Sequence, residues 1–155
     1  MSELHVTKRS NGKKQGAREP IDLDKIHKVI TWAAEGLENV SVSQVEINAG
    51  LQFYDGMPTT EIHETLIKAA SDLISPEAPD NSILAARLNI FHLRKKAYGQ
   101  FEPPHLYDHT KNMVEKGLYD KHLIDDYTQA EFDEMNGWIQ HYRDMNYHYA
   151  AVKQF

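Results

Sequence analysis

The stretch from residue 5 to residue 30 constrains the fold more than any other part of the chain. It begins as a short alternating strand around Val6, and Asn11-Gly12 then gives the strongest short-range signal for a β-hairpin. A second extended run ends at Ile21, and Asp22 stands where a helix N-cap is favoured. The apolar positions that follow have the i, i+3, i+4, i+7 spacing of an amphipathic helix: Ile26, Val29, Ile30 and Ala33. The pattern predicts a basic hairpin that leads directly into a capped helix.

Start and stop signals divide the next part of the chain into helices. The first helix is expected over residues 22–35, with Gly36 as its stop. A capping-box pattern at Ser41 predicts a second helix that ends near residue 53, and Ser43 with Glu46 offers an alternative register. A turn is expected over residues 54–58, because Asp-Gly and Pro punctuate local structure.

Two longer helices should follow that turn. Thr59 is expected to cap the third helix, which would end near Leu73. Asp80 is expected to cap the fourth, over residues 81–98, whose apolar residues surround most of its circumference. This fourth helix should therefore be the most buried. Beyond residue 100, shorter helices are expected over residues 105–116, 128–140 and 143–153, the second of them opened by a capping box of Thr128 and Glu131.

Composition and charge exclude several classes of protein. The chain has 155 residues, a net charge of −6 and no cysteine, so disulfides, thiolate metal sites and cysteine-based radical chemistry are excluded within it. Residues 1–28 hold seven basic and four acidic residues, a balance of +3, and the rest of the chain therefore carries −9. A small basic patch on an acidic body favours a small anion over a nucleic acid, which needs a broad basic face. The absence of a long apolar run argues against a membrane span, and a cytoplasmic location is expected.

Catalytic and metal chemistry find little support in the residue pattern. His105 and His109 flank Asp108 at helical spacing, but a zinc site needs a third ligand and a second shell. No phosphate-cradling motif of the G-x-x-x-x-G-K-[ST] or G-x-G-x-x-G type occurs, and no Ser-His-Asp arrangement has a local signature. We therefore expect no catalytic residue and no metal site. Suitable donor atoms also occur in His141, Asp144 and His148, but no spacing in the sequence connects these residues with the histidine pair.

A nucleoside triphosphate suits the basic N-terminal region better. Several cations must converge where water is partly excluded, because a single exposed ion pair contributes only about 0–1 kcal/mol. Thr59 and the first N–H groups of the third helix add an anion site of the helix N-terminal type. Apolar residues that could flank a base belong equally well to the core: Val6, Ile21, Ile26 and Ile62. The available cations are Lys8, Arg9, Lys25 and Lys95 or Lys96, and a merely solvated hairpin remains the alternative.

A set of motifs along the whole chain resembles the ATP-cone domain of the large subunit of aerobic class I ribonucleoside-diphosphate reductases. In the first part these motifs are Val6-Thr7-Lys8-Arg9, Ile21-Asp22-Leu23-Asp24-Lys25-Ile26, Trp32-Ala-Ala-Glu-Gly36, Asp55-Gly56 with Thr59, Ile62-His63-Glu64-Thr65, and Ala85-Ala-Arg87 through Phe91-His-Leu-Arg94-Lys95-Lys96-Ala-Tyr98-Gly99. The continuation is similar to the chain between the cone and the catalytic barrel: Gln100-Phe-Glu-Pro-Pro104, Tyr107-Asp108-His109, Tyr119-Asp120 and Arg143-Asp144-Met145.

The resemblance implies a mainly α fold, in which a four-helix cone is capped by a small β-hairpin or three-stranded sheet and followed by a short helical segment. It implies an ATP-cone regulatory domain over residues 1–99 and a helical connector over residues 100–155, leading toward a barrel that this sequence lacks. ATP or dATP would act as the allosteric effector, with Mg²⁺ as a companion ion. The partners implied are the radical-generating small subunit and other large subunits, and dATP would favour an assembly that blocks radical transfer. The chain would then regulate an oxidoreductase without being an enzyme itself.

Carried over by resemblance, the nucleotide site draws on residues far apart in the sequence. Lys8, Lys95 and Thr59 would hold phosphates with Arg9 nearby, and His63 would lie beside the sugar. Glu19 would face the adenine amino group. The wrap around base and ribose would consist of Glu19, Pro20, Ile21, Asp22, Leu23, Asp24 and Lys25.

Two features depart from the family pattern, and two other functions remain open. The hairpin loop is enlarged by residues 13–17, and Pro20 lacks the N–H that a strand donor would need. Because the sequence also lacks the reductase barrel with its radical and redox-active cysteines, we expect either an excised fragment or a stand-alone regulatory piece. One alternative function is a helical interaction module that docks the small subunit without nucleotide dependence. The other is a repressor with an ATP-cone, which is disfavoured because that class uses a cysteine-rich zinc ribbon.

Overall fold

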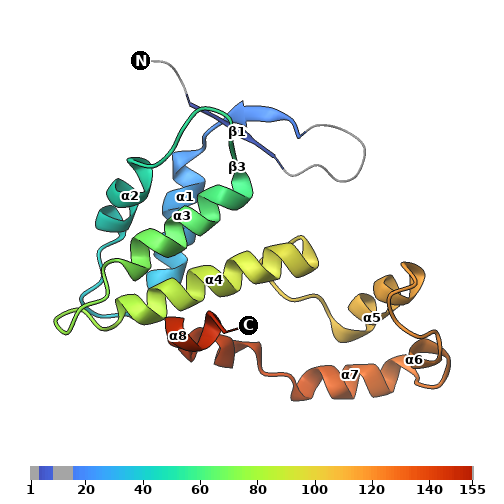
Figure 1. Ribbon diagram of the computed structural model, residues 1–155. Helices are drawn as coiled ribbons and strands as arrows, with labels where there is room; N and C mark the ends of the chain where they lie inside the picture. Colours follow the sequence, from blue (N-terminus) through green and yellow to red (C-terminus); the bar gives the residue numbers. More distant parts are fainter. Residues whose placement is uncertain (1–3, 9–15, 155) are drawn as a thin grey trace. The chain divides into compact units, whose positions relative to one another are not determined.

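The computed structural model describes residues 4–8 and 16–154 of the chain (Figure 1). These form two compact units, one of Met1–Leu93 with Asp144–Phe155 and one of Arg94–Arg143. The strands are β1 (His5–Thr7), β2 (Arg18–Pro20) and β3 (Met57–Pro58). The helices are α1 (Leu23–Ala34), α2 (Val42–Gly50), α3 (Thr59–Ser71), α4 (Asn81–Tyr98), α5 (Leu106–Glu115), α6 (His122–Asp125), α7 (Gln129–Trp138), the 3₁₀ helix η1 (His141–Asn146) and α8 (Tyr149–Val152). The predicted mainly α fold with a small sheet is confirmed.

The sheet of the first unit has the strand order β2-β1-β3. β1 pairs antiparallel with β2, as a hairpin requires, and parallel with β3, which comes from the turn before α3. β3 continues directly into α3, so the central strand is tied to a helix that begins more than fifty residues later (Figure 1). The predicted turn at Asn11-Gly12 lies outside the described residues.

The predicted helix starts are largely confirmed, with one register decided by the structure. Asp22 caps α1 by accepting a hydrogen bond from the backbone N–H of Lys25, and Gly36 follows that helix with a φ of +71°. Ser41 caps α2 by accepting from the N–H of Gln44, so the Ser43 register is not used. α2 then ends at Gly50, earlier than expected.

Two predictions of local structure were wrong. Thr59 does not cap α3: it is the first helical residue, and Pro58 holds the N-cap position without a side-chain hydrogen bond. A proline at this position cannot donate an N–H and is already extended, so it starts the helix by fixing φ rather than by capping. The single helix expected over residues 143–153 is split into η1 and α8.

The core of the first unit is built from the buried faces of α1 to α4 and the inner side of the sheet. α2 packs against both α1 and α3. As predicted, α4 contributes heavily, because its small and branched residues allow close approach of neighbouring helices. The most deeply buried side chains are Ile30, Ala33, Val45, Ala49, Met57, Leu66, Ala69, Ala70, Leu84, Ala85 and Ala86.

The segment after residue 143 returns to the first unit and packs on α4. Val152 and Met145 lie against Ala86 and Ile90 in one apolar cluster. Arg87 donates from Nε to the Met145 carbonyl and from Nη1 to the carbonyls of Ala33 and Glu35 at the end of α1. This guanidinium thus satisfies helix-end carbonyls that would otherwise lack a partner.

The second unit is a small helical assembly around Phe132. The rings of Tyr107 and Tyr127 contact Phe132 edge to face, at centroid distances of 5.5 and 6.4 Å. The predicted capping box is confirmed: Thr128 and Glu131 exchange hydrogen bonds at the start of α7, and the Thr128 N–H holds the pKa of Glu131 below its usual value. Among the described residues, no helix is long and apolar enough to cross a membrane.

Replacement of Leu66 by alanine should destabilise the first unit, because Leu66 is 2% exposed and its loss leaves a cavity among α3 neighbours. The expected decrease in the free energy of unfolding is about 2–5 kcal/mol, measured by urea denaturation. Leu51→Ala is the matched control, since Leu51 is 83% exposed. Equal effects of the two substitutions would contradict this description of the core.

Candidate nucleotide-binding site

Alternation along β1 and β2 places the charged residues of the hairpin on two different faces. Val6 and Met57 are buried and lie opposite one another in the sheet, so their side of the sheet faces the helices. Glu19 pairs with Val6 and shares that inner face. Lys8, two residues after Val6, points the same way, and its Nζ lies 2.6 Å from Glu19 Oε2. Two predicted nucleotide contacts therefore meet in one ion pair, with both side chains about half exposed.

Pro20 fits β2 without losing a ladder hydrogen bond. The Lys8 N–H donates to the Ala17 carbonyl at 3.0 Å, and the Ile21 N–H donates to the Leu4 carbonyl at 2.9 Å. In an antiparallel ladder these bonded pairs alternate with non-bonded ones, and Pro20 with His5 falls at a non-bonded pair. The missing donor of Pro20 thus has no consequence for the sheet, and Ile21 supplies the backbone donor.

The start of α1 brings together a second pair of predicted residues. Asp22 Oδ1 accepts from the Lys25 N–H at 3.0 Å, and Lys25 Nζ lies 3.1 Å from Asp22 Oδ2. The Lys25 backbone N–H, followed by its side chain, lowers the pKa of Asp22. Leu23 and Asp24 are exposed and Ile21 is half-buried, so the segment expected to surround the base and ribose is open to solvent.

The first turn of α3 lies next to the sheet. Thr59 directly follows β3, and the helix starts without a side-chain cap, which leaves its first N–H groups dependent on other acceptors. Tyr54 donates its hydroxyl to Glu61 Oε2 at 2.7 Å, and this bond raises the pKa of Tyr54. The carboxylate of Glu61 is therefore held by the preceding loop.

Further along α3, His63 meets a residue that the sequence did not single out. Its ring lies 5.7 Å from the ring of His92 on α4, at an angle of 44°. His92 is 8% exposed. No local signal in the sequence identifies this pair, because the two residues lie on separate helices. Of the apolar residues considered for the base, Val6 and Ile62 are buried in the core, whereas Ile21 and Ile26 are half-buried.

The structure does not place two of the predicted cations relative to these residues. Lys95 lies in the last turn of α4, in the second unit, where its Nζ is 5.2 Å from the centre of the Phe101 ring. Arg9 lies outside the described residues. Lys8, Glu19, Asp22, Lys25, Thr59 and His63 all belong to the first unit.

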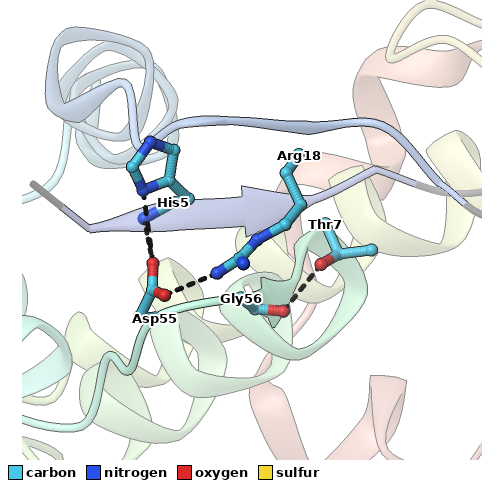
Figure 2. Close-up of polar contacts among 5 residues, drawn as sticks. All are labelled: His5, Thr7, Arg18, Asp55 and Gly56. Carbon is cyan, nitrogen blue, oxygen red and sulfur yellow. Dashed lines mark hydrogen bonds and ion pairs between the residues drawn. The ribbon is translucent and has the colours of Figure 1, made fainter.

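The opposite face of the sheet carries a polar cluster that sequence reasoning missed. Figure 2 shows Asp55 between His5 and Arg18, with Thr7 donating its hydroxyl to the Gly56 carbonyl at 2.8 Å. Asp55 Oδ2 accepts from Arg18 Nη2 at 2.5 Å, and Asp55 Oδ1 accepts from the His5 N–H at 2.9 Å. The Asp-Gly turn was visible in the sequence, but nothing there connects Asp55 with Arg18.

The second unit has a half-open pocket of about 450 Å³ at the end of α4 and along α5. Its polar lining includes Lys96, Asp108, His109 and Lys116. The paired histidines considered for a metal act separately: His105 caps α5, and His109 lies edge-on to the rings of Tyr98 and Tyr119. No group of three potential metal ligands gathers within the part of the chain that the structure describes.

Comparison with known proteins agrees with the motifs. The model of the ATP cone domain matches residues 12–96. The chain is 66% identical over 142 residues to ribonucleoside-diphosphate reductase 1 subunit alpha of Escherichia coli (strain K12), which covers 92% of the chain and 19% of that relative. It is 64% identical over 151 residues to subunit alpha of Haemophilus influenzae, covering 97% of the chain and 19% of the relative.

A more distant relative, subunit alpha of Enterobacteria phage T4, is 40% identical over 144 residues and again covers 92% of the chain and 19% of the relative. The chain thus spans about a fifth of the length of these relatives. The matched region begins after β1 and includes β2, β3, the helices α1 to α3 and most of α4. The chain belongs to the ATP cone domain family, as its sequence motifs predicted.

Proposed function

We propose that this chain is the allosteric ATP- and dATP-binding domain that regulates a ribonucleoside-diphosphate reductase. The observation that supports this most is the Lys8–Glu19 ion pair on the helix-facing side of the sheet. It places a cation for phosphate and an acceptor for an amino group side by side, within a chain of the ATP cone family. These are the two chemistries that an adenine nucleotide presents.

On nucleotide binding, Lys8 and Glu19 would each give up their contact with the other and bind a group of the nucleotide instead. An ion pair between half-exposed side chains contributes only about 0–1 kcal/mol, so a triphosphate can draw Lys8 away at little cost. Charge-assisted hydrogen bonds to phosphate oxygens are stronger than neutral ones. Glu19 would then be available to accept from the adenine amino group.

The other contacts of the proposed site come from three places. Thr59 and the first N–H groups of α3 would take phosphate oxygens. Lys95 and Arg9 would add cations, Mg²⁺ would accompany the phosphates, and His63 would lie beside the sugar. The base and ribose would be wrapped by Glu19, Pro20, Ile21, Asp22, Leu23, Asp24 and Lys25.

Regulation, in this proposal, acts through assembly rather than through chemistry on this chain. Residues 1–99 would form the regulatory domain, and residues 100–155 would connect it to a catalytic part. A contact to the 2′-hydroxyl is worth about 0.5–1.5 kcal/mol, so ATP and dATP would be distinguished mainly by the assembly of large and small subunits that each favours. The chain itself would carry no catalytic residue, and a cytosolic location is part of the proposal.

A second candidate function is a helical docking module for the small subunit that is indifferent to nucleotide. The exposure of large apolar side chains in the second unit favours it, because such residues are enriched at interfaces. These are Leu118, Tyr119, Leu123, Tyr127, Trp138, Ile139 and Tyr142. Small-subunit binding that does not change between ATP and dATP would support this function over the first.

Replacement of Lys8 by alanine should weaken ATP binding about fivefold or more, because one charge-assisted contact to phosphate is lost. The measurement is calorimetric titration of the folded chain with ATP. Lys68→Ala is the matched control, since Lys68 Nζ also forms a 2.6 Å pair with a carboxylate, that of Asp72, on an exposed helix surface. An unchanged affinity of Lys8→Ala would remove Lys8 from the site, and no heat with wild type would refute the proposed function.

Replacement of His63 by alanine should narrow the difference in affinity between ATP and dATP, if the imidazole lies beside the 2′ position. The expected change in the affinity ratio is about twofold to tenfold, the range of one hydrogen bond. Competition titrations of both nucleotides measure it, with His122→Ala as control because His122 is an exposed histidine of α6 paired with Asp126. A ratio that stays at the wild-type value would place His63 away from the sugar.

A further inference from the structure

A single carboxylate on the outer face of the sheet contacts or adjoins all three strands. Asp55 accepts from the backbone N–H of His5 in β1 and from the guanidinium of Arg18 in β2, and it lies two residues before β3 (Figure 2). Its Oδ1 is also 3.3 Å from His5 Nδ1. The opposite, inner face of the same sheet carries Lys8 and Glu19. We call the contacts of Asp55 with His5 and Arg18 the outer clasp.

The backbone of His5 explains why a carboxylate is needed at this point. His5 and Pro20 form a non-bonded pair of the antiparallel ladder, so the N–H and C=O of His5 point toward β3. The His5 carbonyl accepts from the Gly56 N–H at 2.7 Å, but β3 begins only at Met57. Asp55 therefore supplies the acceptor that a longer β3 would have provided. Its pKa is lowered, first by this N–H and then by Arg18, so the carboxylate is ionised at neutral pH.

Arg18 reaches Asp55 by crossing the outer face of β1, as Figure 2 shows. It lies opposite Thr7 in the ladder and beside Gly56, where a Cβ would be in ordinary van der Waals contact with Arg18 Nη2, at 3.4 Å. Gly56 also has a φ of +84°, which favours glycine. The turn that presents Asp55 thus has a backbone conformation that favours glycine and lies alongside the guanidinium.

Arg18 and Glu19 are neighbours on a strand of only three residues. Successive side chains of a strand point to opposite faces. The contact of Arg18 with Asp55 on the outer face therefore restricts the rotation of β2, and with it the position of Glu19 on the inner face. Within residues 4–8 and 16–154, β2 is an edge strand with β1 as its single neighbour. The backbone bonds on either side of Glu19 hold β2 against β1, and the clasp adds a side-chain contact from the outer face.

We propose that Asp55 and Arg18 are positioning residues for nucleobase selectivity, acting through Glu19 from the opposite face of the sheet. The inference rests on the proposed function, in which Glu19 accepts from the adenine amino group. Phosphate binding depends on Lys8 and the start of α3. Arg18, by contrast, is the neighbour of Glu19 on β2, and its replacement leaves the contact of Asp55 with the His5 N–H in place. Loss of the clasp should therefore reduce recognition of the base more than recognition of the phosphates.

The test compares ATP with inosine triphosphate, which carries a carbonyl in place of the 6-amino group, and with inorganic tripolyphosphate. Calorimetry on the whole chain should show that Asp55→Asn and Arg18→Gln each reduce the preference for ATP over inosine triphosphate about threefold to tenfold. Affinity for tripolyphosphate should change less than about twofold. Arg18→Lys keeps the charge and should retain most of the preference.

The matched controls are Asp72→Asn and Lys68→Gln, which break an ion pair of similar exposure on α3: the Asp72 and Asp55 side chains are 54% and 53% exposed. They should leave the preference at the wild-type value. If wild type prefers ATP and the clasp variants keep that preference, or if the controls lose as much, the positioning role is refuted while the proposed function stands. If wild type has no preference for ATP, the proposed recognition by Glu19 fails, and the inference fails with it. Should Asp55→Asn not fold, the two Arg18 variants decide the question.

Discussion

The alternation of side chains along β1 is the constraint on which the rest of the site depends. Four successive residues divide between two faces: Val6 and Lys8 turn toward the helices, and His5 and Thr7 turn outward. Burial of Val6 decides the direction, since a shift of one residue would expose it. The same burial therefore places the cation of Lys8 beside Glu19. One strand register therefore determines both the burial of Val6 and the position of the side chains proposed to bind the nucleotide.

The central strand also connects segments that lie far apart in the sequence. Its parallel partner β3 leads without a break into α3, so the sheet and the first turn of that helix are held together by backbone hydrogen bonds. The outer clasp adds side-chain contacts from the turn before β3 to both strands of the hairpin. The arrangement of side chains on the inner face of the sheet therefore depends on the strand pairing and on the contacts of the outer face.

Local patterns predicted most of the helices because caps and apolar spacing are short-range properties. Asp22, Ser41 and the Thr128–Glu131 box could be found this way. The two-residue strand β3 could not be found, since its pairing with β1 is set by contacts across fifty residues and not by local propensity. For the same reason the sequence indicated Lys8 and Glu19 singly but did not show that they form one ion pair, and it did not connect Asp55 with Arg18. Thr59 was misassigned as a cap because Pro58 before it can start a helix without one.

The central claim is that an adenine nucleotide separates Lys8 from Glu19 and binds to both. A crystal structure of the chain with ATP tests it most directly. The account predicts that Lys8 Nζ lies within hydrogen-bond distance of a phosphate oxygen and that a Glu19 carboxylate oxygen accepts from the adenine amino group. A structure in which ATP is bound elsewhere, with Lys8 Nζ still paired to Glu19 Oε2 at 2.6 Å, would contradict it.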